Sequence, residues 1–178
     1  ITSYDTDHGC TTAVFTVSGS VFRVDLATGE LTAVEVGAGA FDPRLSPDGQ
    51  RLAVVTGTTF KVVSIAAPQT PLIELSSDSA DTRWGVAEFI AAEEMGRMRG
   101  HWWSPDGTQL LLARVDNSPV SEWSLSDPAQ PWARHQSMKY PAAGTANATV
   151  SFHLVDLSSG ALTPVEWDAT AFEYVARA

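Results

Sequence analysis

The sequence is short of cysteine, of positive charge and of long hydrophobic runs. Cys10 is the single cysteine among 178 residues, so no internal disulfide can form and folding does not depend on oxidation. Only 11 Lys and Arg residues stand against 21 Asp and Glu residues, which gives a net charge of −10. Because binding to a phosphate backbone requires clustered Lys and Arg, we expect no nucleic-acid partner.

No apolar run approaches the roughly 20 residues that a membrane-spanning helix needs, so we expect no membrane partner. The first residues, Ile1 to Asp5, contain neither a basic nor a hydrophobic leader segment and include no methionine. We therefore expect the chain to be a piece of a longer protein. The sequence leaves the compartment open, with the cytoplasm slightly favoured.

Metal-ligand spacing is also missing. Asp5, Asp7, His8 and Cys10 lie close together in the sequence, but they are better interpreted as flexible polar residues near the terminus than as a zinc site. The other histidines are scattered. We expect no metal and no cofactor.

What the sequence does contain is a succession of short strand patterns separated by turn residues. β-branched and aromatic runs at 12–17 and 21–26 flank Ser18-Gly-Ser20, which is the signature of a hairpin. Similar runs, separated by turn residues, continue along the chain. We expect strands at residues 12–17, 21–26, 31–36, 41–45, 51–56, 60–65 and 72–75, and again within 101–113.

Two different hairpin sequences occur twice. Ser-Pro-Asp-Gly at 46–49 returns at 104–107, and the stretch 24–35, Val-Asp-Leu-Ala-Thr-Gly-Glu-Leu-Thr-Ala-Val-Glu, returns in similar form at 155–166. Repeated hairpins of this kind indicate stacked units of about four strands, which is the organisation of β-propeller blades. A plain β-sandwich would also explain the hairpins, but it explains their paired repetition less well.

We therefore predict an all-β fold: a partial β-propeller with about three four-stranded blades of a larger propeller, and a fourth blade beginning at 170–177. The cut ends of such an arc expose apolar blade faces. This arrangement predicts association with other copies.

One stretch breaks the strand pattern and predicts a short inserted helix near residues 86–96. The apolar residues that share one face of this helix are Val86, Phe89 and Ile90. Glu93 and Glu94 continue the same face at its end, where carboxylates partly removed from water require a cationic partner or several hydrogen bonds. Glu88 lies early in the helix and is better explained by the positive end of the helix dipole than by ligand binding.

Residues 81–107 combine this helix, its Glu pair and the double tryptophan Trp102-Trp103 before the Ser-Pro turn, and they resemble the propeller of the dipeptidyl peptidase IV family, especially the dipeptidyl peptidase 8 and 9 branch. The resemblance continues at 115–123 and 139–150. It implies a parent similar to serine exopeptidases that remove an N-terminal dipeptide, preferentially after proline or alanine. It also implies that a C-terminal α/β-hydrolase catalytic domain follows a propeller that here comprises residues 1–178.

By this resemblance, Glu93 and Glu94 bind the free ammonium of the substrate. The chemistry is reasonable, because a peptide α-amino group titrates near 7.7 to 8.0 and carries three N–H donors when charged. Each charge-assisted hydrogen bond is worth about 1.5 to 3 kcal/mol. Both acids converge on one cation only if the helix ends or distorts there, and Gly96 permits such an end.

The chain departs from the family pattern in two respects. It contains no Gly-x-Ser-x-Gly, so we expect no catalytic residue in it and no activity from this segment alone. No residue between 8 and 24 matches the family's substrate-contacting arginine, so none is assigned. The expected partners are peptides with a free N-terminus, the hydrolase domain of the same chain, and further copies in a homo-oligomer.

Two functions remain open at this point. The first is a non-catalytic propeller segment that binds peptide N-termini and restricts access to the catalytic domain. The second is a catalytically inactive propeller that serves as a protein-interaction module. A downstream Gly-x-Ser-x-Gly followed by Asp and His would favour the first.

Overall fold

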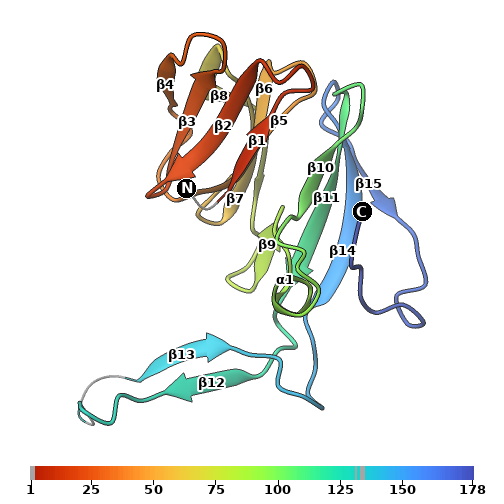
Figure 1. Cartoon of the computed structure of the whole chain (residues 1–178). Coiled ribbons are helices and arrows are strands. Elements are labelled where there is room, and N and C mark those ends of the chain that lie inside the picture. The colour runs from red at the N-terminus through yellow and green to blue at the C-terminus, as the bar shows by residue number, and fades with distance from the viewer. Residues whose placement is uncertain (1–2, 131, 133–134) are drawn as a thin grey trace.

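Three antiparallel sheets follow one another along the chain in the computed structural model, which describes residues 3–130, 132 and 135–178 (Figure 1). In the first two sheets the four strands lie side by side in sequence order. The first sheet comprises β1 (Tyr4–Thr6), β2 (Thr12–Val17), β3 (Ser20–Asp25) and β4 (Leu31–Val34). The second comprises β5 (Ala40–Leu45), β6 (Arg51–Thr56), β7 (Thr59–Ser64) and β8 (Ala67–Ser76).

The third sheet has the same core of four strands but carries two insertions. Its order is β10-β11-β14-β15, and β9 also pairs with β11. The bounds are β9 (Thr82–Trp84), β10 (His101–Trp103), β11 (Gln109–Asp116), β14 (Thr149–Asp156) and β15 (Leu162–Val165). The single helix of the described residues, α1 (Phe89–Glu93), lies between β9 and β10.

The second insertion is a two-stranded arm that leaves the sheet between β11 and β14. Its strands are β12 (Glu122–Leu125) and β13 (Gln136–Lys139), and Figure 1 shows it projecting away from the three sheets. Five large apolar or aromatic side chains of the arm and its base are exposed, namely Trp123, Leu125, Trp132, Met138 and Tyr140. The arm therefore presents a hydrophobic surface.

The sheets bury their apolar residues against one another. One core cluster joins the first and second sheets through side chains such as Val14, Val21 and Leu52. A second cluster joins the second and third sheets through Phe60 and Leu112, both fully buried. Each sheet thus depends on its neighbour for burial, as blades of a propeller do.

The two repeated sequences fold into two repeated turns. In both Ser-Pro-Asp-Gly turns the serine N–H donates to a carbonyl five residues on, and the serine hydroxyl donates to the aspartate at 2.6 Å. Asp25 and Asp156 likewise open equivalent turns, accepting backbone N–H groups two and three residues ahead. The partial β-propeller predicted from the repeats is therefore confirmed.

The structure corrects two details of that prediction. Residues 170–177 were expected to begin a fourth blade, but they lie in turn and irregular structure and pair with no strand of the described chain. Asp7 is not a flexible terminal residue: it is 8% exposed, and its carboxylate accepts hydrogen bonds from the backbone N–H groups of Thr11 and Thr12.

The turn aspartates predict how stability depends on pH. Donation from the Ser104 hydroxyl and from Thr108 lowers the pKa of Asp106 from 3.8 to about 2. A lowered folded-state pKa contributes stability that is present above the unfolded value and is lost as the pH falls toward 2. We expect Asp106→Asn to show a shallower loss of thermal stability than the parent protein between pH 4 and pH 2. Parallel melting curves across that range would contradict this assignment.

Candidate functional site

The site is built on an interruption of one strand. β9 and β10 both pair antiparallel with β11, β9 opposite Arg114–Asp116 and β10 opposite Leu110–Leu112. Between these two stretches, Gly85 N–H donates to Ala113 O and Ala113 N–H donates to Gly100 O, both at 2.8 Å. β9 and β10 are thus one strand in space, and residues 85–100 form an excursion from it that carries α1.

The two ends of the excursion touch where they leave and re-enter the sheet. A Cβ on Gly100 would lie 2.3 Å from backbone atoms of Val86 and 2.4 Å from the carbonyl carbon of Gly85. His101, fully buried, places Nδ1 2.9 Å from Gly85 O. Burial lowers the pKa of His101, so the neutral ring donates this hydrogen bond and fastens the closure.

The helix is shorter than the predicted 86–96, because its N-cap residue is Glu88 and its last residue is Glu93. Glu88 is 7% exposed, and its carboxylate accepts hydrogen bonds from Ile90 N–H and Ala91 N–H, each at 2.6 Å. The structural role expected for Glu88 is confirmed. The predicted packed face is wrong in part, since Ala91 is the buried helix residue and Phe89 is 36% exposed.

The acid pair sits at the point where the helix ends. Glu93 is the last helical residue and Glu94 is the C-cap. Gly96 adopts φ +65°, a left-handed conformation that suits a helix end, and the chain reverses so that Arg97 N–H donates to Ala91 O at 2.8 Å. The end expected from Gly96 is therefore present directly after the two acids.

Both acids are exposed, contrary to the partial burial expected from the helix pattern. Among the described residues, the side chains of Glu93 and Glu94 take part in no hydrogen bond or ion pair. Two neighbouring negative charges at the negative end of a helix repel one another and attract a cation. A positively charged group at this position would offset the repulsion between the two carboxylates.

The Glu88 cap predicts a separate effect on stability. Glu88→Ala leaves Ile90 N–H and Ala91 N–H without their acceptor, and we expect the free energy of unfolding to fall by about 1 to 2 kcal/mol. Glu88→Gln keeps an acceptor oxygen and serves as the matched variant, with a smaller loss. Chemical denaturation measures both. If Glu88→Ala were as stable as the parent protein, the cap would make no contribution to stability.

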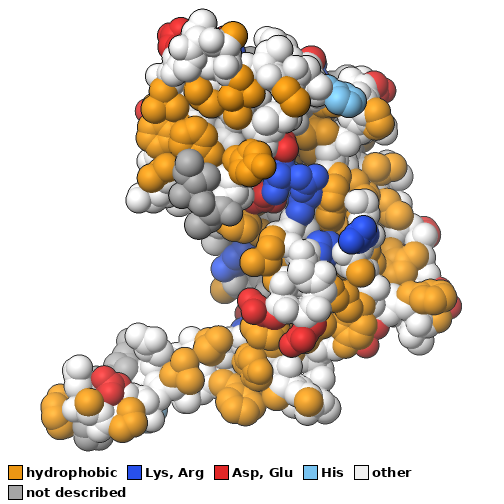
Figure 2. All heavy atoms as spheres, in the orientation of Figure 1, with side chains coloured by type: hydrophobic (Ala, Val, Ile, Leu, Met, Phe, Trp, Pro, Cys, Tyr) orange, Lys and Arg blue, Asp and Glu red, His pale blue; other side chains and the backbone are white. Residues whose placement is uncertain are grey.

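The sequence interpretation missed a group of arginines beside the acid pair. Arg44, Arg97, Arg99 and Arg177 line an open cavity of about 400 Å³, whose wall also includes Met95 and Gly96; we call it the arginine cavity. Figure 2 shows Lys and Arg side chains gathered near the middle of one face, with acidic side chains next to them over α1. The available signal was the closely spaced arginines at 97 and 99, which are unusual in so acidic a chain.

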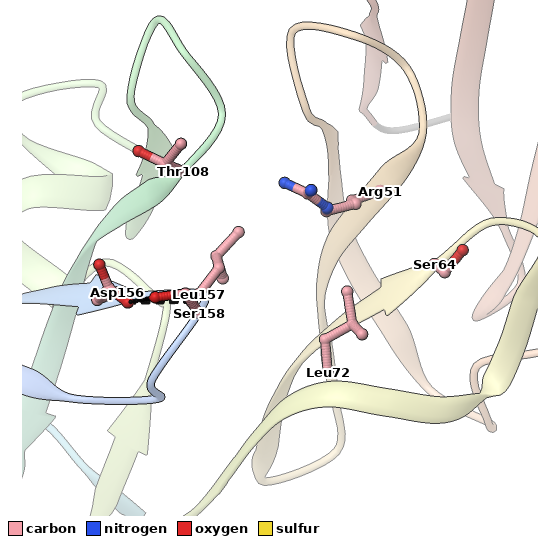
Figure 3. Close-up of a pocket in the computed structure, with 7 residues that line it drawn as sticks. All are labelled: Arg51, Ser64, Leu72, Thr108, Asp156, Leu157 and Ser158. Carbon is pink, nitrogen blue, oxygen red and sulfur yellow. Dashed lines mark hydrogen bonds between the residues drawn. The ribbon is translucent and has the colours of Figure 1, made fainter.

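A larger hollow lies between the second and third sheets, away from the acid pair (Figure 3). It measures about 640 Å³, and its two charged residues, Arg51 and Asp156, already have partners. Arg51 Nη1 donates to Gly107 O at 2.9 Å across the seam, and the Asp156 carboxylate accepts from Ser158 and Ser159. This hollow is a structural seam between blades.

Aromatic side chains connect α1 to the arm. The Phe89 ring meets the Tyr140 ring edge to face at 5.3 Å, and Tyr140 meets Trp123 at 5.6 Å. On β10, Trp103 Nε1 donates to Arg44 O at 3.1 Å, so Trp103 packs between blades. Trp102 instead lies beneath the Arg97 guanidinium, whose Cζ is 6.0 Å from the centre of the Trp102 ring.

Residues 3–130, 132 and 135–178 contain no group of three His, Cys, Asp or Glu side chains placed to hold a metal ion. Within the same ranges, no helix is long and apolar enough to cross a membrane.

Comparison with known proteins gives a consistent result. The family model for the dipeptidyl peptidase IV (DPP IV) N-terminal region matches residues 14–178. A probable dipeptidyl peptidase 4 of Neosartorya fischeri is 30% identical over 132 residues, which cover 70% of this chain and 17% of that protein. Human dipeptidyl peptidase 8 is 27% identical over 165 residues, covering 77% of this chain and 18% of that protein.

The fold is likewise similar to a solved structure. The crystal structure of Porphyromonas gingivalis dipeptidyl peptidase 4 matches with a TM-score of 0.76 and 22% identity, over 94% of this chain and 26% of that one. Of the curated relatives described above, the chain spans less than a fifth of the length.

Proposed function

This chain belongs to the dipeptidyl peptidase IV N-terminal-region family, as a segment of its β-propeller, and from that premise we propose that it binds the N-terminus of peptide substrates. Glu93 and Glu94 hold the α-ammonium group. The propeller restricts access to a C-terminal α/β-hydrolase domain of the same chain, where the parent releases N-terminal dipeptides.

The observation that carries this proposal is the state of the acid pair. Three acids lie in or beside α1, and Glu88 is already used by the helix cap. Glu93 and Glu94 are exposed at the helix end without a cationic partner among the described residues. An ammonium group with three donors supplies both the missing positive charge and the missing hydrogen bonds.

Fixing the ammonium at one point also explains selectivity. A nucleophile at a set distance from that point reaches only one peptide bond, because an extended peptide rises about 3.3 Å per residue. An internal segment of a protein offers no ammonium group and is not held. The decisive test is therefore turnover of peptides by full-length protein in which the two acids are neutralised.

The parent is also proposed to form a homo-oligomer. The exposed Trp123, Leu125 and Met138 of the arm give this proposal a surface, since aromatic and Met residues are enriched in protein interfaces. The same surface would serve an inactive propeller acting as an interaction module. The acid pair favours the peptidase, because an interaction module has no need of a receptor for ammonium groups.

A further inference from the structure

The arginine cavity concentrates positive charge in a chain that has little of it. Four of the 11 Lys and Arg residues line this one cavity, although the net charge of the chain is −10. They come from distant parts of the sequence: Arg44 lies on β5, Arg97 and Arg99 on the excursion, and Arg177 near the end of the chain. Folding has brought them together on one face.

Most of this charge is not neutralised by the protein. Arg44 pairs with Asp42 at 2.5 Å and with Asp5 at 3.6 Å. Arg97 has no carboxylate partner in the described residues, because its guanidinium donates to two backbone carbonyls, Val175 O and Arg99 O, both at 2.8 Å. The side chains of Arg99 and Arg177 likewise form no ion pair or hydrogen bond there.

Arg97 and Arg99 are costly to leave without an ion-pair partner, whereas Arg177 is exposed. Arg97 is 7% exposed, and burial lowers its pKa, which Glu88 only partly offsets. The pKa of Arg99 is lowered by burial and then by the like charge of Arg44, which the carboxylates of Asp5 and Asp42 only partly offset. A buried charge without a partner destabilises a protein, so an arrangement of this kind suits an anion that arrives from outside.

The cavity is close to the acid pair along the backbone. Met95 and Gly96, the two residues that follow Glu94, form part of its wall. Two residues span at most about 7 Å, so the backbone of Glu94 lies within that distance of the wall. A peptide held by its ammonium at the acid pair therefore has its first few side chains within reach of the arginines.

We propose that the arginine cavity binds a carboxylate of the peptide itself, on an Asp or Glu side chain among its first four residues. The segment then recognises two opposite charges at a fixed separation: a positive chain end on Glu93 and Glu94, and a negative side chain on Arg99 and Arg177. The planar guanidinium suits this role because it donates paired hydrogen bonds to a carboxylate. The inference rests on the proposed function and adds a substrate preference to it.

The experiment compares matched peptides in the full-length protein. Two peptides differ only by Glu or Gln at the third or fourth residue, and kcat and KM are measured for each. We expect kcat/KM to be about 10-fold higher for the Glu peptide, mainly through KM, and this ratio to shrink in high salt. In the double variant Arg99→Gln/Arg177→Gln we expect the ratio to fall close to one.

Lys61→Gln is the matched control, because it removes one positive charge from β7, outside the cavity, and should keep the 10-fold ratio. A ratio near one in the parent protein, or a preference that persists in the double variant, would overturn the proposal. Inorganic phosphate that binds the cavity while the two peptides remain equivalent would overturn it too, by identifying a free anion as the ligand. The double variant should fold, since neither side chain forms a bond within the described chain, and its melting curve verifies this.

The outcome is separable from the proposed function. Neutralising Glu93 or Glu94 should reduce turnover of the Glu and Gln peptides alike, because both carry the ammonium group. If that neutralisation has no effect, the ammonium site fails. The ratio of kcat/KM between the Glu and Gln peptides would still test the role of the arginines independently.

Discussion

Full-length protein carrying Glu93→Gln or Glu94→Gln is expected to lose about two orders of magnitude in kcat/KM for dipeptide release. Each substitution removes a negative charge that faces the ammonium and leaves only a neutral acceptor oxygen; the full charge-assisted hydrogen bond is worth about 1.5 to 3 kcal/mol, and a loss of 1.4 kcal/mol is a tenfold change. Because the ammonium also sets the position of the scissile bond, we expect kcat to fall along with the rise in KM.

Folding should be preserved in both variants. The two side chains are exposed and form no bond among the described residues, and surface changes of this kind are usually within about 0.5 kcal/mol. An N-acetylated peptide is the matched control on the substrate side, since it has no ammonium to lose and should be turned over equally poorly by parent and variants. Near-normal turnover of the free peptide by both variants would contradict the assignment.

The second large effect is expected from Gly100→Ala, which should lower the free energy of unfolding by about 3 kcal/mol or more. The added Cβ would lie 2.3 Å from Val86 backbone atoms, and backbone on both sides of the contact cannot move aside as a flexible side chain can. The closure of the excursion must open, so peptide turnover should fall with stability. Thermal melting and kcat/KM are the two measurements.

Gly9→Ala provides the matched control. A Cβ there would meet Asp7 Oδ2 and Thr11 Cγ2 at 3.5 Å, which is ordinary contact, so we expect little change in melting temperature. If Gly100→Ala had the same melting temperature as Gly9→Ala, the contact between the two ends of the excursion would not be essential to the fold.

Local features of the chain could be predicted from its sequence. The strands over 12–17 and 51–56 coincide with β2 and β6, because alternating β-branched residues bounded by turns leave few other solutions. The repeated turns identified the blades for the same reason, since each depends on its own Ser, Asp and Gly. Glu88 was also correctly interpreted, because a cap is decided within one helical turn.

Features set by distant residues could not be predicted. The helix pattern placed Phe89 on a buried face, but the closure between residues 85 and 100 turns α1 so that Ala91 packs inward. The arm strands were missed because β12 and β13 are only four residues long each and almost entirely exposed, so no buried face marks them in the sequence. The arginine cavity unites residues 44, 97, 99 and 177, and proximity of this kind is a property of the fold alone.

The division of one strand into β9 and β10 makes the loop that carries Glu93 and Glu94 a modular part of the domain. The ladder on β11 is complete on either side of Ala113, so the blade's hydrogen bonding does not depend on what the intervening loop contains. The length and chemistry of that loop can change while the two glycines at its base keep the blade intact. A protein built this way can acquire, alter or discard a recognition element without redesigning its scaffold.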